Sequence, residues 1–244
     1  RLGKAFTEYT WGNIGYRFEN VKISKVAPED ETNFLTNETR ITSRLTPIIT
    51  RDTRDNRLNP TEGTTENLSA QYAGGILGGV NFYKLSAEKS YYQPLFLGLI
   101  GMLHGKIAYA KGYSGDVLPV YERYFMGGPL DLRGFTFEDV GPQDSDGNPL
   151  GGEKLLLFNA EIQYPFNNSL RGIIFYDRGN VYGNGDDISL TSENFSLSKM
   201  RHSIGVALQV QSAVGPIGLA YGYKLDKADG EEPAEFHFIL GRTF

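Results

Sequence analysis

The sequence contains no cysteine, only three methionines and one tryptophan in its 244 residues. Without cysteine it can form neither a disulfide framework nor a thiolate zinc site. Its longest nearly apolar stretch, 95–103, has nine residues interrupted by glycines, far short of the roughly 20 that a transmembrane helix needs. If the chain crosses a membrane, it must therefore do so with β-strands.

Basic surfaces and catalytic signatures are also lacking. The net charge is −5 and lysines and arginines do not cluster, so we expect no nucleic-acid partner. The three histidines are scattered without metal-ligand spacing, and neither a phosphate-binding loop nor a serine-hydrolase elbow occurs. Segment 144–148 is acidic like a calcium loop, but its glycine is misplaced, which favours a polar turn. We therefore expect a protein that is not an enzyme and that binds no metal or cofactor.

Glycine and aromatic residues are abundant instead, with 30 glycines, 15 tyrosines and 15 phenylalanines. Apolar and polar residues alternate along most of the chain, in runs longer than the roughly five to six residues of soluble strands. This pattern predicts an all-β, antiparallel protein of about ten strands, with 1–6 as the tail of an earlier strand. The predicted strands are 10–24, 38–51, 64–74, 81–93, 99–112, 155–164, 171–182, 199–211, 216–225 and 235–244.

The alternation separates an aliphatic and aromatic face from a polar or small one. In 155–164, for example, Phe158 and Ile162 oppose Asn159 and Glu161. Such faces fit a transmembrane barrel with lipid outside and water inside. They fit equally well a soluble barrel with the faces exchanged, so alternation alone does not decide between the two.

Connection lengths favour the membrane alternative. The expected loops on one rim are long and polar, whereas those on the other are mostly short, as in outer-membrane barrels. The long loops are 25–37, 127–152, 183–198 and 226–233, and the opposite turns are 52–63, 94–98, 165–170 and 212–215. Lys89 lies on the lipid-facing side of its strand, so we expect it near a rim, whereas Ile173 and Phe175 face inward and require a covering loop.

Loop 127–152 is long enough to be functional and contains the run Gly127-Gly128-Pro129-Leu130-Asp131-Leu132-Arg133-Gly134-Phe135. We interpret it as a plug folded into the barrel. A guanidinium removed from bulk water needs acidic partners. Glu161 and Asp177 are inward-facing carboxylates on the next two strands, so pairing of Arg133 with either would hold the loop. The alternative is a solvated loop arginine.

The last predicted strand has an aromatic outward face and ends on an aromatic residue. This face contains Phe236, Phe238, Leu240 and Phe244. A terminal outward aromatic resembles the C-terminal signal of bacterial outer-membrane proteins; the alternative is an ordinary alternating strand.

Three motifs together resemble the Omp85 superfamily of outer-membrane barrels, and its BamA branch in particular. They are the arginine loop around Arg133, Gly134 and Phe135, the turn 51–63 with its D-x-R-D-N and P-x-x-G pattern, and the order of the last strands. The resemblance implies that Arg133 pairs with Glu161 and Asp177, with Asp131 in the same loop. It also implies a sixteen-stranded barrel preceded by POTRA domains, of which this chain would be the C-terminal part, a single partial domain 1–244 lacking the first six strands.

The resemblance implies an assembly factor of the bacterial outer membrane that folds and inserts client β-barrels. Its seam would lie at the terminal strand, with Phe236, Phe238, Leu240, Gly241 and Phe244, and glycines 218, 222 and 241 would loosen packing there. Expected partners are the lipid bilayer and lipopolysaccharide, unfolded outer-membrane proteins and accessory lipoproteins. The alternative is a two-partner secretion pore of the same superfamily. A third class is a patatin-like lipase fused to this type of barrel, which an upstream G-x-S-x-G would reveal, whereas the arginine loop disfavours a plain diffusion porin.

Overall fold

The computed structural model describes residues 1–22, 39–183, 197–212 and 215–240, and these form one antiparallel sheet in which each strand pairs with its neighbours in sequence. The sheet contains eleven strands within the described residues. They are β1 Leu2–Ala5, β2 Thr10–Lys22, β3 Thr39–Asp52, β4 Gly63–Ala73, β5 Phe82–Pro94, β6 Ile100–Gly112, β7 Lys154–Pro165, β8 Leu170–Tyr182, β9 Arg201–Ser212, β10 Gly215–Lys224 and β11 Ala234–Leu240. Short 3-10 turns occur at Gly75–Leu77, Phe96–Gly98, Val120–Glu122 and Leu197–Lys199.

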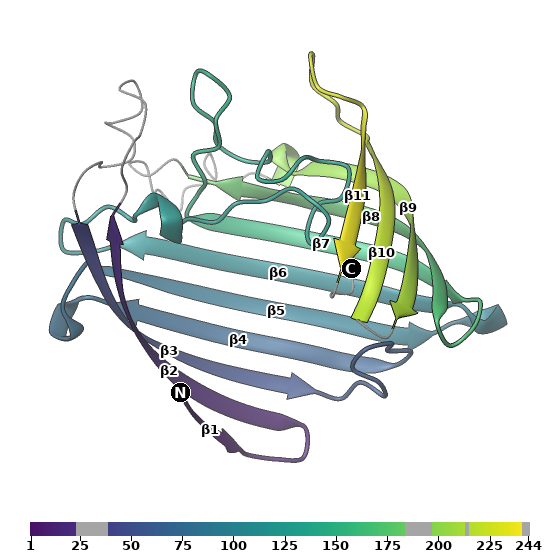
Figure 1. The fold of residues 1–244 in the computed structure, drawn as a ribbon, viewed down its shortest axis with the longest axis horizontal. Helices are drawn as coiled ribbons and strands as arrows, with labels where there is room; N and C mark the ends of the chain where they lie inside the picture. The colour runs from purple at the N-terminus through teal and green to yellow at the C-terminus, as the bar shows by residue number, and fades with distance from the viewer. Residues whose placement is uncertain (23–38, 184–196, 213–214, 241–244) are drawn as a thin grey trace.

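The predicted all-β, antiparallel fold is confirmed, and most predicted strand ends agree within one or two residues. The count is eleven because the expected tail 1–6 forms a short strand, β1, which pairs with β2 from Leu2↔Ile14 to Ala5↔Trp11. The sheet curves strongly, so that β9–β11 stand in front of the long strands β5 and β6 in this view (Figure 1). β1 and β11 form its two edges, and no ladder joins them within the described residues.

The two faces of the sheet differ as the alternation predicts. On β7 the inward Asn159, Glu161 and Gln163 are 4–6% exposed, whereas the outward Phe158 and Ile162 are 41% and 49% exposed. A soluble barrel would bury its apolar face and expose its polar one, so the structure excludes that alternative. No helix in the described part of the chain is long and apolar enough to cross a membrane.

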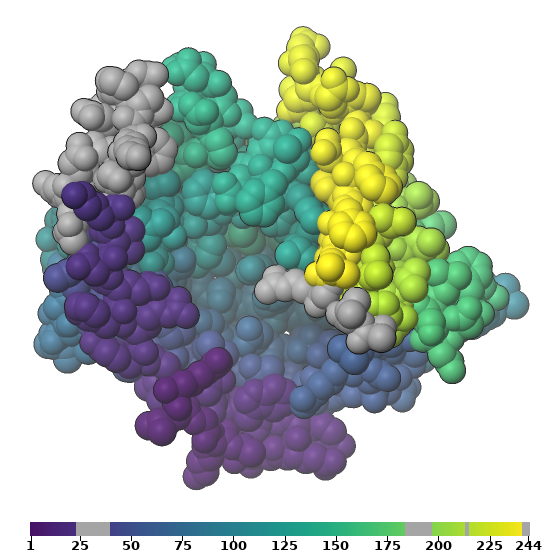
Figure 2. All heavy atoms as spheres, in the orientation of Figure 1, coloured from purple at the N-terminus to yellow at the C-terminus, as the bar shows by residue number. Residues whose placement is uncertain are grey.

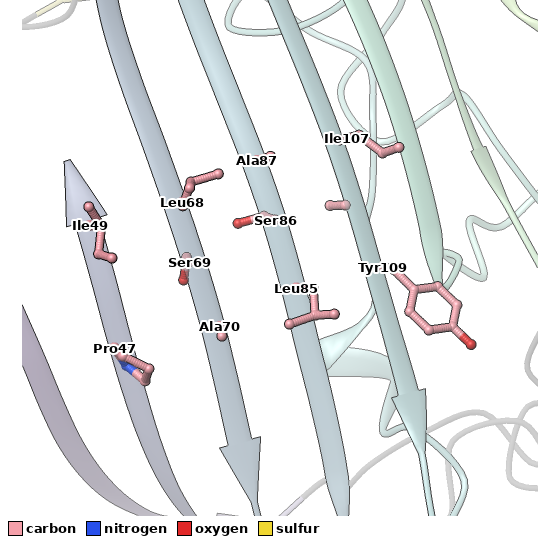
Figure 3. A pocket seen from close by; sticks show the side chains of 11 residues that line it. Pro47, Ile49, Leu68, Ser69, Ala70, Leu85, Ser86, Ala87, Ile107 and Tyr109 are labelled. Atoms are coloured by element: carbon pink, nitrogen blue, oxygen red, sulfur yellow. The ribbon is translucent and has the colours of Figure 1, made fainter. Parts of the chain in front are cut away.

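A patch of the outer face on β3–β6 illustrates this arrangement. Ile49, Leu68, Leu85 and Ile107 lie on adjacent strands, each about half exposed. They line a shallow depression of about 510 Å³ together with small side chains such as Ala70 and Ala87 (Figure 3). Such an apolar surface, left open by the chain itself, suits acyl chains.

Lys89 lies on this outer face, as predicted. Its partner in the ladder is Glu66, three residues from the start of β4, which places both near the rim that carries the 53–62 turn. Lys89 Nζ reaches Glu66 Oε1 at 2.6 Å. A cross-strand carboxylate therefore compensates this lysine, a partner that the sequence pattern did not reveal.

The described connections differ in length between the two rims. Residues 113–153 between β6 and β7 form the longest described connection, while β5–β6 and β7–β8 are joined by 95–99 and 166–169. The predicted loop 25–37 and most of 183–198 lie outside the described residues, as do positions 213–214 of the turn 212–215.

Candidate functional site: the luminal connection and the wall around Arg133

The connection 113–153, here called the luminal connection, lies against the concave face of the sheet. In Figure 2 its teal atoms fill part of the hollow beside the yellow terminal strands. Its buried residues include Leu118, Met126, Leu132, Phe135 and Val140. The loop therefore carries its own apolar core into the hollow, as expected for a segment that folds inward.

Arg133 lies between the two carboxylates of the adjacent strands. Its Nε and NH2 donate to the two oxygens of Asp177 on β8, both at 2.7 Å. Its NH1 is 2.7 Å from Oε1 of Glu161 on β7. The three side chains are at most 3% exposed. One buried cation thus faces two carboxylates, an arrangement that fixes the loop in position and direction.

The guanidinium of Arg133 lies over the ring of Phe175. The Arg133 Cζ lies 3.7 Å from the ring centroid, within the range of a cation–π contact. Phe175 packs with Ile173, Ala207 and Ala220, which explains why β8 directs apolar residues inward. Burial alone would lower the pKa of Arg133, but Glu161 and Asp177 outweigh burial and raise it above its ordinary value. Arg133 therefore remains charged.

The peptide unit between Arg133 and Gly134 bonds to the wall through both of its polar groups. Ser203 Oγ on β9 donates to the Arg133 carbonyl. The Gly134 amide donates to His237 Nε2 on β11 at 2.9 Å. Gly134 has a φ of +91°, and a Cβ on Gly222 of β10 would meet Gly134 N at 2.5 Å. Only glycines permit this approach of two backbones.

Phe135 is fully buried, and two cations of the wall lie close to its ring. Arg201 Cζ and Lys224 Nζ lie 4.8 and 5.1 Å from its ring centroid. On its apolar side the ring belongs to a cluster with Leu132 and Val181. The aromatic residue after Gly134 thus anchors the loop tip by both packing and charge.

Asp131 organises the loop rather than pairing with a cation. Its Oδ1 accepts from the Gly127 amide at 3.0 Å and from the Leu132 amide at 2.6 Å. Asn159 Nδ2 donates both to the Asp131 carbonyl, at 2.7 Å, and to Asp177 Oδ1, at 2.8 Å. Burial raises the pKa of Asp131 to about 6, against the two amide donors. This carboxyl group therefore titrates closer to neutrality than an ordinary aspartate.

A polar chain continues from Glu161 to the opposite rim. Gln163 Nε2 donates to Glu161 Oε2 at 2.6 Å, and Arg171 NH1 donates to Gln163 Oε1 and, at 3.1 Å, to the carbonyl of Pro60. Pro60 belongs to the 53–62 turn, whose shape explains the D-x-R-D-N and P-x-x-G pattern. The loop and this turn are thus joined by buried side chains.

The turn is held by its own acidic residues. Arg54 Nε and NH2 donate to the two oxygens of Asp52 at 2.9 and 3.0 Å. Asp55 accepts from the Thr61 amide at 2.9 Å, the Thr61 hydroxyl at 2.7 Å and the Glu62 amide at 3.2 Å. Burial raises the pKa of Asp55, but these three bonds outweigh burial and hold it below its usual value. Gly63 has a φ of +99°, where a Cβ would meet Thr53 O at 2.4 Å.

A second anchor of the luminal connection was missed by sequence reasoning. Glu122, 5% exposed, pairs with Arg44 of β3, which also pairs with Glu19 of β2. Lys84 of β5 donates to the Glu122 carbonyl at 2.7 Å. The one available signal was the charged pair Glu122-Arg123 within the otherwise aromatic stretch 121–125.

The terminal strand has the expected outward face. Phe236, Phe238 and Leu240 are 58–62% exposed, whereas Gly241 and Phe244 lie outside the described residues. Gly222 was expected to loosen packing, but it is buried against Gly134 and instead permits close packing. The wall, its apolar outer face and the arginine loop docked inside together define a transmembrane β-barrel protein with a luminal plug-like loop.

The chain belongs to the Omp85 superfamily, because the model of the Omp85 superfamily domain matches residues 1–244. It is 29% identical to the outer membrane protein assembly factor BamA of Nitratidesulfovibrio vulgaris, over 97% of this chain and 30% of that protein. The BamA of Neisseria meningitidis serogroup B is 28% identical over 80% of this chain and 28% of its own length. The chain therefore spans less than a third of the length of these relatives.

A solved structure has the same fold. The crystal structure of BamA from Haemophilus ducreyi lacking POTRA domains 1–3 matches with a TM-score of 0.77 at 21% identity, over 97% of this chain and 52% of that one. The predicted BamA-type Omp85 barrel is thereby confirmed.

Proposed function

We propose that this chain forms the C-terminal part of the barrel of an outer-membrane protein assembly factor, in the bacterial outer membrane, and that client β-barrels are inserted along β11. The named BamA relatives support the activity. No covalent chemistry is involved. Accessory lipoproteins and lipopolysaccharide are further partners that the resemblance implies.

One observation carries this proposal: β11 is an edge strand of the sheet that the described residues form. Its ladder to β10 runs from Ile217↔Leu240 to Tyr223↔Ala234, and no strand in the described part of the chain pairs with its other side. An edge strand offers unpaired backbone donors and acceptors to another strand. Here the outward side chains are apolar as well, so a client strand added to this edge would already face lipid.

Crosslinking tests the proposal in the full-length protein in phospholipid vesicles. Single cysteines replace Phe238 or Ile239 on β11, and the client is an unfolded outer-membrane barrel carrying one cysteine in its terminal strand. The chain itself contains no cysteine. We expect a disulfide with the client during assembly. The matched control is Phe158→Cys, equally outward on β7 and 41% exposed.

Two outcomes contradict the insertion function. The first is client assembly without a crosslink at β11, or with equal crosslinking at Phe158→Cys, which would show that clients do not pair with β11. Crosslinks of an unfolded client to inward positions such as Gln209→Cys, with no client left in the membrane, support secretion through the lumen.

A further inference from the structure

The loop tip contacts the terminal strand as well as the two carboxylates. The Gly134 amide donates to Nε2 of His237 at 2.9 Å, and His237 is 7% exposed on the inward face of β11. A ring nitrogen that accepts a hydrogen bond carries no proton, so the proton of the neutral ring is on Nδ1. Within the described part of β11, His237 is therefore the side chain that accepts a hydrogen bond from the loop tip.

The backbone around this bond fixes its direction. Gly134 has a left-handed φ of +91°, and its backbone lies directly on Gly222 of β10. On the other side of the same peptide, Ser203 Oγ donates to the Arg133 carbonyl. Because β9 and β10 hold the peptide in place, its amide can satisfy its hydrogen bond with β11 only while that strand keeps its position.

The hydrogen bond also connects the fixed loop tip to the edge strand β11. Arg133 is fixed to β7 and β8 by Glu161 and Asp177, whereas β11 is paired on one side alone within the described residues. A buried amide left without its acceptor is unfavourable. Displacement of β11 therefore weakens the docked loop, and displacement of the loop removes an inner support of β11.

We propose that His237 is a positioning residue that couples the docked Arg133–Gly134 tip to the terminal strand, so that loop release and β11 release favour each other. The coupling itself does not depend on the proposed function, but its biological role does. If clients insert along β11, a client strand that displaces β11 would loosen the loop, and by reciprocity an undocked loop would favour client pairing.

The test is hydrogen–deuterium exchange of the full-length protein in detergent micelles, without any client. Amide exchange is followed in loop residues 127–139 and in β11. For His237→Leu, which lacks the acceptor, we expect about fivefold faster exchange in both segments, the factor that corresponds to loss of one ordinary hydrogen bond. His237→Gln supplies an acceptor oxygen at similar reach and should restore slow exchange, whereas the shorter His237→Asn should not.

The matched control is Phe238→Leu, an outward substitution on the same strand, which should leave the loop unchanged. The proposal is overturned if His237→Leu affects β11 alone, or if His237→Gln exchanges as fast as His237→Leu. Since no client is present, failure of this test is separate from failure of the insertion function. Conversely, suppose that His237→Leu accelerates exchange in both segments while β11 forms no crosslink with a client. The coupling would then hold and the proposed function would be wrong.

Discussion

Arg133 and Asp177 form a bidentate pair, with the guanidinium Nε and NH2 each 2.7 Å from one carboxylate oxygen. Asp177 also accepts from the backbone amide of Arg133 at 3.1 Å. One carboxylate thus orients both the side chain and the main chain of the loop tip. Glu161 Oε1 lies 2.7 Å from NH1, on a different guanidinium nitrogen, so the two acidic residues are not equivalent.

We predict that Asp177→Asn destabilises the barrel more than Glu161→Gln does. Asparagine cannot accept both guanidinium donors, and the buried cation then loses half of its compensating charge. Breaking a buried pair in this way costs about 3 kcal/mol or more. The measurement is the urea midpoint of the folded band in gels of the micelle-bound protein. Glu66→Gln is the control, because its pair with Lys89 is exposed and contributes at most about 1 kcal/mol; an equal loss in that control would contradict the assignment.

We predict that Gly222→Ala displaces the loop without disrupting the ladder of β10. The added Cβ would lie 2.5 Å from Gly134 N and 2.6 Å from its Cα, a clash with main chain that costs about 1 to 3 kcal/mol. Protease cleavage within 127–139 should increase while the barrel stays folded. Gly105→Ala on β6 is the matched control, since its Cβ would come no closer than 3.9 Å to the nearest atom. Unchanged protection in Gly222→Ala would show that the backbones do not meet.

We predict that Glu122→Gln frees the first part of the luminal connection. Arg44 would keep only the more exposed Glu19 as its acidic partner, and Lys84 would lose a carboxylate. The expected loss is about 1 to 3 kcal/mol, with faster amide exchange in 113–126. Glu8→Gln, in the exposed turn before β2, should have no effect. Faster exchange confined to 127–139 would argue against a separate anchor.

Asp131 predicts a pH dependence. Its pKa is raised to about 6 in the folded protein, above the unfolded value of about 3.9, so its ionised form opposes folding. That penalty is present above pH 6 and disappears as pH falls from 6 to 4. Asp131→Asn keeps an oxygen for the two amides but does not titrate. The variant should be more stable by on the order of 2 kcal/mol at pH 8, with the difference vanishing near pH 4. A constant difference across this range would contradict burial of the carboxylate.

The strands were predictable because the alternation of apolar and polar residues that defines each strand lies within a short stretch of sequence. Period-two alternation marked both ends and faces of β7, β9 and β10, and parity placed Glu161 and Asp177 inward without knowledge of the fold. Pairing of Arg133 with both acids followed from the loop motif and the resemblance.

The remaining site contacts were not predictable, because they join residues far apart in sequence through the hollow of the barrel. His237 is 103 residues from Gly134, and Glu122 is 78 from Arg44. No periodicity links such positions. Gly205 and Gly222 gave a faint signal, since they are partners in the ladder of β9 and β10, but only the docked backbone of Gly134 explains why β10 lacks a side chain at Gly222.

The two anchors of the luminal connection have a mechanical consequence. Glu122 fastens one end to β3 and β5, and the tip at 133–135 fastens the other to β7–β11. The segment therefore spans the cavity as a strut between opposite sides of the bent sheet. Bending that widens the sheet must stretch or detach this strut, so the width of the barrel and the seating of one short segment of chain cannot vary independently.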